Sequence, residues 1–149
     1  MADSTIATNR KATHLYEILE TYEAGLVLTG AEIKAIRAHK VSLAGSYGRL
    51  LGNGPDQDPE LFWVGGTITV PGEDATRSRK LLLHRKEIGR LIGKLTEKGL
   101  TLIPLSLYLK RGRAKLEVGL GRGRKAHDKR DVIKARESRR EIDRHTKTA

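Results

Sequence analysis

The sequence predicts a mainly β protein with flanking helices: a small closed antiparallel β-barrel of the OB type, followed by a basic C-terminal tail. Three observations lead to this class. Short runs of alternating apolar residues recur between turn residues, two segments carry helical signals, and positive charge gathers at the C-terminal end. About six strands with two helices between them are typical of a small closed barrel, and barrels of this type commonly bind nucleic acid.

The 149 residues suit one domain with a tail. We expect a flexible N-terminus over residues 1–8, the barrel over 9–121 and the tail over 122–149. The net charge is +11, of which residues 110–149 carry +9. Residues 122–149 hold no aromatic residue and few aliphatic ones. Such a segment is expected to be disordered when free and to fold on a partner that neutralises its charge. The alternative is a solvated tail without a particular function.

The first strand is predicted over residues 13–23, continuing to Leu28. Tyr16, Ile18 and Tyr22 fall on one side of this segment, and Glu17 and Glu23 fall on the other. A period of two residues indicates a strand.

Two helices are predicted. Thr29 and Glu32 have the spacing of a capping box, and Ile33 and Ile36 follow one turn apart. The second helix shows apolar residues at i, i+3, i+4 and i+7, namely Ile88, Leu91, Ile92 and Leu95. Gly99 is a natural stop after it. The opposite face of this helix is basic, which fits either a solvated face or contact with RNA; its residues are Arg85, Lys86, Arg90 and Lys94.

The other strands follow from alternation and turn residues. They are expected at 47–51, at 61–70 with a bend at Gly65-Gly66, at 80–83, and in a hairpin formed by 103–109 and 114–120. Gly119, Gly121 and Gly123 recur every second residue but lack the Lys-Ser/Thr of a phosphate-binding loop. We interpret them as flexibility at the root of the tail.

Several classes of function are excluded or disfavoured. The chain has no cysteine, and its five histidines lack metal-ligand spacing, so we expect no metal site and no cofactor. There is no apolar run of membrane-spanning length and no signal-peptide pattern, so we expect a cytoplasmic protein that does not contact a membrane. Nothing requires an enzyme, and no catalytic residue is expected. A small hydrolase or nuclease that uses Glu17, Glu20 or Glu23 stays as an alternative.

The charge asymmetry points to a polyanionic partner. Aromatic residues are only 4% of the chain, and several must fill the core. A shortage of stacking side chains favours recognition of a folded RNA through its shape, phosphates and 2′-hydroxyl groups. A ribosomal or ribosome-assembly protein with an OB barrel is the alternative that composition leaves open.

Five segments in order resemble the SsrA-binding protein family, also called small protein B or SmpB. The resemblance runs from about Asn9 to Arg140. The segments are Asn9-Arg10-Lys11-Ala12 with His14, Tyr16 and Ile18; Tyr22-Glu23-Ala24-Gly25-Leu26; Leu28, Gly30 and Glu32-Ile33-Lys34 with Arg37; Arg77 and Arg79-Lys80-Leu81-Leu82-Leu83-His84; and Gly123-Arg124-Lys125 with His127-Asp128-Lys129-Arg130.

The resemblance implies an RNA-binding adaptor of trans-translation, monomeric when free. Its partners would be the tRNA-like domain of transfer-messenger RNA (tmRNA) and the small-subunit decoding centre and mRNA channel of stalled ribosomes. The barrel contacts to RNA would be Asn9, Arg10, Lys11, His14, Glu23, Lys80 and Leu82. For Leu82 the alternative is a core position. The tail would fold as a helix in the empty mRNA channel, through Arg122, Arg124, Lys125, His127, Asp128, Lys129 and Arg130.

Overall fold

The computed structural model describes residues 4–52, 59–96 and 99–123. Within them the chain forms nine strands and three helices, so the expectation of a mainly β protein with few helices is confirmed. In chain order they are β1 (Ser4–Thr8), α1 (Ala12–Leu15), β2 (Tyr16–Leu26), α2 (Gly30–Arg37), β3 (Val41–Ser42), β4 (Tyr47–Leu51), β5 (Glu60–Val64), β6 (Thr67–Ile68), β7 (Arg79–Leu82), α3 (Arg85–Leu95), β8 (Leu100–Lys110) and β9 (Arg113–Gly123).

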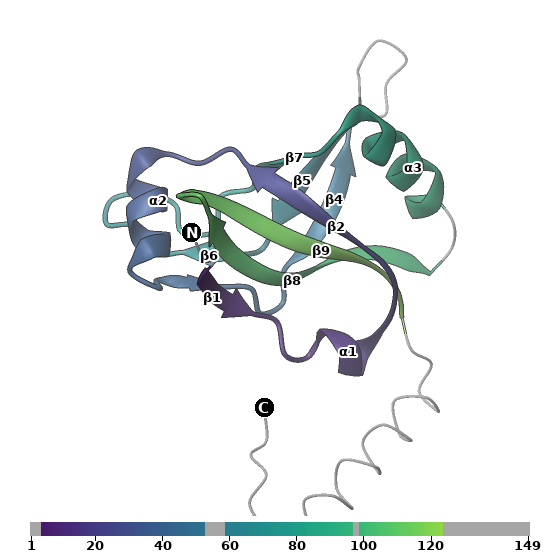
Figure 1. Ribbon diagram of the computed structural model, residues 1–149, viewed down its shortest axis with the longest axis horizontal. Coiled ribbons are helices and arrows are strands. Elements are labelled where there is room, and N and C mark those ends of the chain that lie inside the picture. Colours follow the sequence, from purple (N-terminus) through teal and green to yellow (C-terminus); the bar gives the residue numbers. More distant parts are fainter. Residues whose placement is uncertain (1–3, 53–58, 97–98, 124–149) are drawn as a thin grey trace, which may run out of the picture.

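Seven strands form one antiparallel sheet in the order β1-β8-β4-β5-β7-β2-β9. Because β8 also pairs with β9, the pairings run from β8 through five other strands and back to β8. β3 and β6 form a separate two-stranded sheet. The long strands β2, β8 and β9 curve across the molecule, and α2 and α3 lie at its opposite ends (Figure 1).

The N-terminal segment differs from the expectation. Residues 4–8, expected to be flexible, form β1 and pair with the end of β8 through Ser4 opposite Leu109 and Thr8 opposite Ser106. Without β1, this edge of β8 would have no strand partner. Ile6 and Ala7 of β1 also pack against the core. Residues 13–15, expected as the start of the first strand, belong instead to the single turn of α1 (Ala12–Leu15). The amide nitrogen of Leu15 donates to the carbonyl of Lys11, and the strand begins only at Tyr16.

The glycines of β9 also correct an expectation. Gly119 and Gly121 are buried within a strand that continues to Gly123, so they are not a flexible root. A Cβ at Gly119 would lie 3.0 Å from Ile18 and Leu105, and one at Gly121 would lie 3.0 Å from Tyr16. Side chains of β2 and β8 therefore occupy the space over β9 that larger residues would need.

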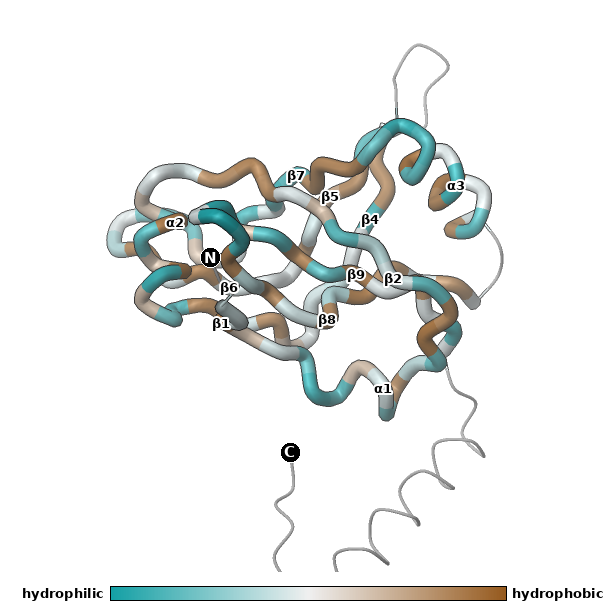
Figure 2. The backbone as a smooth tube through the Cα atoms, viewed as in Figure 1, coloured by the Kyte–Doolittle hydropathy of each residue, from teal (hydrophilic) through white to brown (hydrophobic). Residues whose placement is uncertain are grey.

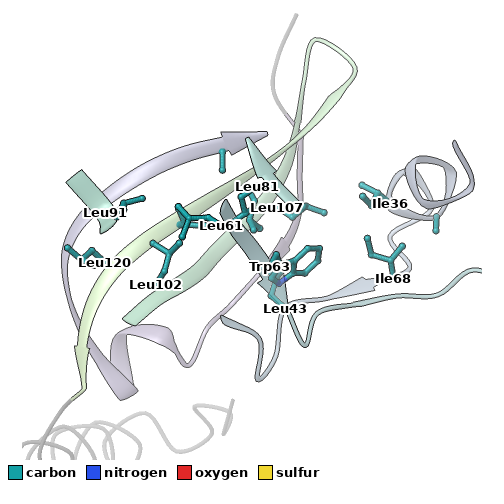
Figure 3. Close-up of a cluster of buried hydrophobic side chains, with 14 of the residues drawn as sticks. Ile36, Leu43, Leu61, Trp63, Ile68, Leu81, Leu91, Leu102, Leu107 and Leu120 are labelled. Carbon is teal, nitrogen blue, oxygen red and sulfur yellow. The ribbon is translucent and has the colours of Figure 1, made fainter. Parts of the chain in front are cut away.

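The core runs along the length of the molecule. Figure 3 shows Leu91 and Leu120 at one end, Leu61, Leu81 and Leu107 in the middle, and Trp63 followed by Ile36 and Ile68 at the other end. α2 begins at the predicted capping box, where Thr29 and Glu32 exchange hydrogen bonds of 3.1 and 2.9 Å. α3 presents its apolar stripe inward and buries Leu91 completely. Both helices thus close the ends of the same core.

Candidate nucleic-acid interface

Strand β7 places Leu82 on the surface. Arg79 and Leu81 are buried, whereas Lys80 and Leu82 point to the outer face because side chains alternate along a strand. Leu82 is 49% exposed, so the alternative that it belongs to the core is wrong. An exposed leucine in an otherwise well-packed strand is available to an apolar surface of a partner.

Bare backbone and a lysine lie beside Leu82. Gly25 of β2 is its register partner. A Cβ added at Gly25 would lie 3.4 Å from the Leu82 Cβ and 3.7 Å from the Lys115 Nζ. Gly25 therefore places backbone without a side chain between Leu82 and the Lys115 ammonium group.

Glu23 stands on the same face, two residues before Gly25. Its carboxylate accepts a hydrogen bond from the Tyr108 hydroxyl and lies 3.4 Å from Lys110 Nζ. The Tyr108 hydrogen bond, more than the lysine charges, holds the pKa of Glu23 below its ordinary value. Glu23 is therefore an oriented, ionised acceptor at neutral pH.

The turn between β8 and β9 adds a basic cluster that was not among the predicted site residues. Together with Glu23 it surrounds a hollow of about 580 Å³; its residues are Lys110, Arg111, Arg113 and Lys115. Arg111 and Gly112 both have positive φ, 53° and 78°.

Lys80 is engaged in an exposed ion pair. Its Nζ lies 2.8 Å from Glu60 Oε2, and both side chains are nearly half exposed. Surface pairs of this kind contribute little to stability, so exchange of Glu60 for a phosphate group costs little.

The remaining predicted barrel residues lie at the other end of β2. The Asn9 side-chain amide donates to the Pro104 carbonyl at 2.9 Å, and its backbone nitrogen donates to the Leu105 carbonyl at 2.8 Å. Asn9 thus anchors the segment between β1 and α1 to β8. Arg10 and Lys11 are exposed, and His14 is half-buried on α1. Figure 2 shows hydrophilic colours in this segment. The structure therefore separates the predicted residues into two groups.

A buried ion-pair network holds the inner face of β7, opposite Lys80 and Leu82. Arg79 is fully buried and donates to Glu32 Oε2 at 2.9 Å, to the Gly66 carbonyl at 2.9 Å and to the Ala75 carbonyl at 3.0 Å. Its guanidinium group also lies 5.5 Å from the centre of the Trp63 ring. Burial alone would raise the pKa of Glu32, but hydrogen bonds from Arg77, the Thr29 amide and Arg79 outweigh burial and lower it.

The three glutamates of the hydrolase alternative do not converge. Glu17 lies 3.7 Å from Arg122, Glu20 is hydrogen-bonded to Arg90 and Tyr22, and Glu23 contacts Tyr108 and Lys110. Each carboxylate has its own partners, so they do not form a paired-carboxylate site. Within residues 4–52, 59–96 and 99–123, no group of three or more His, Asp or Glu side chains could hold a metal ion. None of the helices in these ranges is long and apolar enough to cross a membrane.

Arg122 is the only predicted tail residue among those that the structure describes, and it is exposed at the end of β9. The others lie outside the described residues; they are Arg124, Lys125, His127, Asp128, Lys129 and Arg130.

Comparison with known proteins identifies the family. The model of the SmpB protein family matches residues 6–148. The SsrA-binding protein of Roseiflexus castenholzii is 50% identical, over 97% of this chain and 92% of the relative. That of Thermosynechococcus vestitus is 48% identical, over 99% of each. A solved structure described as "tmRNA-SmpB: a journey to the center of the bacterial ribosome" contains a chain that is 45% identical, with a TM-score of 0.64 over 85% of this chain and 92% of that one. The chain belongs to the SmpB protein family.

Proposed function

We propose that this chain binds the tRNA-like domain of tmRNA and delivers it to stalled ribosomes for trans-translation, as a cytoplasmic RNA-binding adaptor without a catalytic role. The observation that carries the proposal is the likeness, at 45% identity over most of both chains, to a chain in a structure of tmRNA-SmpB and the bacterial ribosome. The SsrA-binding names of the relatives support the same RNA partner. The ring of strand pairings supports an OB-like closed barrel as the scaffold.

The face around Leu82 has the chemistry for a nucleotide. Leu82 offers an apolar wall to an exposed base, and the Glu23 carboxylate accepts hydrogen bonds from base amino or imino groups. Lys80 exchanges Glu60 for a phosphate oxygen. At the far end of β2, Arg10 and Lys11 supply phosphate contacts, while Asn9 and His14 present polar groups to sugar or base.

The basic tail completes the adaptor. Arg122 and the cations that follow it would neutralise ribosomal RNA phosphates in the empty mRNA channel, and His127 would stack on a base. Charge neutralisation removes the repulsion that opposes folding, so the tail becomes helical there.

Competition binding tests the RNA partner. We expect the protein to retain tight binding to the isolated tRNA-like domain in excess bulk tRNA at near-physiological, stated salt, because phosphate contacts alone are strongly salt-dependent and unselective. Leu82→Ala should weaken this binding. Leu19 on β2 is also an exposed leucine, at 41%, and lies away from β7. Leu19→Ala should therefore leave this binding unchanged. Loss of the wild-type protein to the competitor would instead favour a general structured-RNA binder such as a ribosomal or assembly protein.

Deletion of residues 122–149 tests the tail. The truncated protein should bind the tRNA-like domain nearly as well as the full chain, because the barrel contacts remain. It should fail to support peptide tagging on stalled ribosomes. Normal tagging by the truncated protein would exclude a role for the tail in the mRNA channel.

A further inference from the structure

Tyr47 is exposed in a chain that has few aromatic side chains. All six aromatic residues lie in the described ranges, and Tyr47, at 39%, is the most exposed of them. Trp63 is buried in the core. The hydroxyls of Tyr22 and Tyr108 are hydrogen-bonded to Glu20 and Glu23. Tyr16 and Phe62 are half-buried. Tyr47 is therefore the most exposed aromatic residue in the described part of the chain.

Tyr47 lines a groove of about 930 Å³ between the β1–α1 segment and residues 41–47. The volume is within the ~300–1,000 Å³ that small-molecule sites usually have. Arg10 and Lys11 are at the groove, together with Tyr16 and Leu15, and none of its lining residues is Asp or Glu. The groove thus combines two cations, two tyrosines and no carboxylate, which is complementary to an anionic ligand that has a flat ring.

The Tyr47 backbone is held rigidly at the start of β4. In the preceding turn, the Ser46 amide and hydroxyl both donate to the Leu43 carbonyl, at 3.1 and 2.6 Å. Gly45 and Gly65 both have positive φ, 72° and 83°, and a Cβ at Gly65 would lie 3.6 Å from the Gly45 oxygen. The two turns therefore pack directly against each other. This support limits the backbone freedom that the segment would lose when Tyr47 binds a ligand.

We propose that this groove binds one unstacked nucleotide of a structured RNA, with its base stacked on Tyr47 and its phosphates against Arg10 and Lys11. The proposal deepens the RNA-binding function proposed above and rests on it. It adds a stacking contact at the end of β2 away from Leu82. The nucleotide belongs either to the tRNA-like domain of tmRNA or to ribosomal RNA, and both offer the same chemistry.

Binding to these two RNAs, measured separately, tests the stacking contact. The proteins compared are wild type, Tyr47→Leu, Tyr47→Phe and the control Leu19→Ala, with thermal melting to confirm equal folding. Stacking of a base on an aromatic side chain corresponds to a loss of roughly 5- to 150-fold on its removal. We expect Tyr47→Leu to show this loss for one of the two RNAs. Tyr47→Phe should stay within about twofold of wild type because it keeps the ring.

The outcomes are distinct. Unchanged binding of Tyr47→Leu to both RNAs overturns the proposal, and so does an equal loss in Tyr47→Phe, which would assign the effect to the hydroxyl. A loss confined to the ribosome assigns the nucleotide to ribosomal RNA. Failure of wild type to prefer the tRNA-like domain over bulk tRNA would overturn the proposed function, while a Tyr47→Leu effect on ribosome binding would still stand.

The salt dependence tests whether the cations and the ring share one nucleotide. Arg10→Gln should reduce the slope of log affinity against log salt by roughly 0.7, the value for one single-strand phosphate contact. Tyr47→Leu should leave that slope unchanged, because stacking releases no counterions. The fold-loss of RNA affinity in the double variant Arg10→Gln/Tyr47→Leu should be smaller than the product of the two single fold-losses, because both residues contact one nucleotide. Independent losses in the double variant would contradict a shared nucleotide.

Discussion

Glu32 and Glu23 both pair with basic side chains, but Glu32 is buried and Glu23 is exposed. Glu32 lies behind β7, 1% exposed, against the fully buried Arg79. Glu23 lies on the outer face of β2, beside Lys110 and Tyr108, in a pair whose side chains are 40–45% exposed. The two sites have similar side chains, and both glutamates have pKa values lowered by hydrogen bonds.

The difference lies in what happens when a partner leaves. Removing one member of a buried pair strands a charge in a low-dielectric interior, so the Glu32 network holds α2, β7 and the 66–75 segment together. An exposed member that loses its partner is solvated by water at little cost. The cations near Glu23 can therefore exchange a carboxylate for a phosphate group at little cost, whereas Arg79 cannot.

The largest effect is expected for Arg79→Gln. It removes the partners of Glu32, the Gly66 carbonyl and the Ala75 carbonyl at once. Breaking a buried pair costs about 3–5 kcal/mol, and we expect a loss of this size in the free energy of unfolding, measured by urea denaturation followed by circular dichroism.

Arg77→Gln is the matched control. Arg77 also contacts Glu32, but its side chain is 40% exposed. The variant should lose less than half as much stability, because Arg79 and the Thr29 amide still satisfy the Glu32 carboxylate. Equal losses in the two variants would show that burial does not set the difference.

A smaller effect, and on a different property, is expected for Glu23→Gln. Stability should change by no more than about 1 kcal/mol, as for other exposed pairs. Affinity for the tRNA-like domain should fall by about tenfold or more, since an ionised acceptor contributes about 1.5–3 kcal/mol to a hydrogen bond. Titration of RNA into both proteins at one stated salt measures this loss.

Glu117→Gln controls for charge. Glu117 is opposite Glu23 in the register of β2 and β9, and its substitution removes the same charge from the same neighbourhood. It should not weaken RNA binding. If both variants bind equally weakly, the effect of Glu23 is not that of a specific acceptor.

Local patterns in the sequence carried much of the fold. The alternation of Tyr16, Ile18 and Tyr22, the Thr29–Glu32 capping box and the apolar stripe of α3 each depend on residues a few positions apart, and each produced the expected element. The exposure of Leu82 followed in part from the same logic, because one of three consecutive leucines in a strand must face away from the other two.

Long-range pairing supplied what local patterns could not. β1 forms only because β8 has an open edge, and Gly119 and Gly121 are required by side chains from β2 and β8 that lie over them. The Arg79–Glu32 pair joins residues 47 positions apart. The basic cluster at the turn after Lys110 meets Glu23 only through the register of β2 with β9. Tyr47 stood in a predicted strand, but its exposure depends on how residues 41–47 pack against the β1–α1 segment.

The smallest effect on stability is expected for the exposed ion pair between Arg90 of α3 and Glu20 of β2. Arg90 donates hydrogen bonds to both oxygens of this carboxylate. The hydrogen bond from Arg90, with a second from Tyr22, lowers the pKa of Glu20 from 4.5 to about 2. The folded state therefore binds the proton more weakly than the unfolded state, and the pair stabilises the fold fully only above about pH 4.5. This contribution is lost as the pH falls toward about 2.

The pH dependence of the melting temperature tests this contact. Arg90→Gln should melt below wild type at neutral pH, and the difference should narrow as the pH falls below about 4.5. Arg85→Gln removes a charge from the same helix without touching Glu20, so its difference from wild type should vary less with pH. In Glu20→Gln, the further change Arg90→Gln should have an effect that does not depend on pH in this range, because the titrating partner is absent. A constant gap between wild type and Arg90→Gln would instead mean that Arg90 stabilises the fold by something other than its ion pair with ionised Glu20.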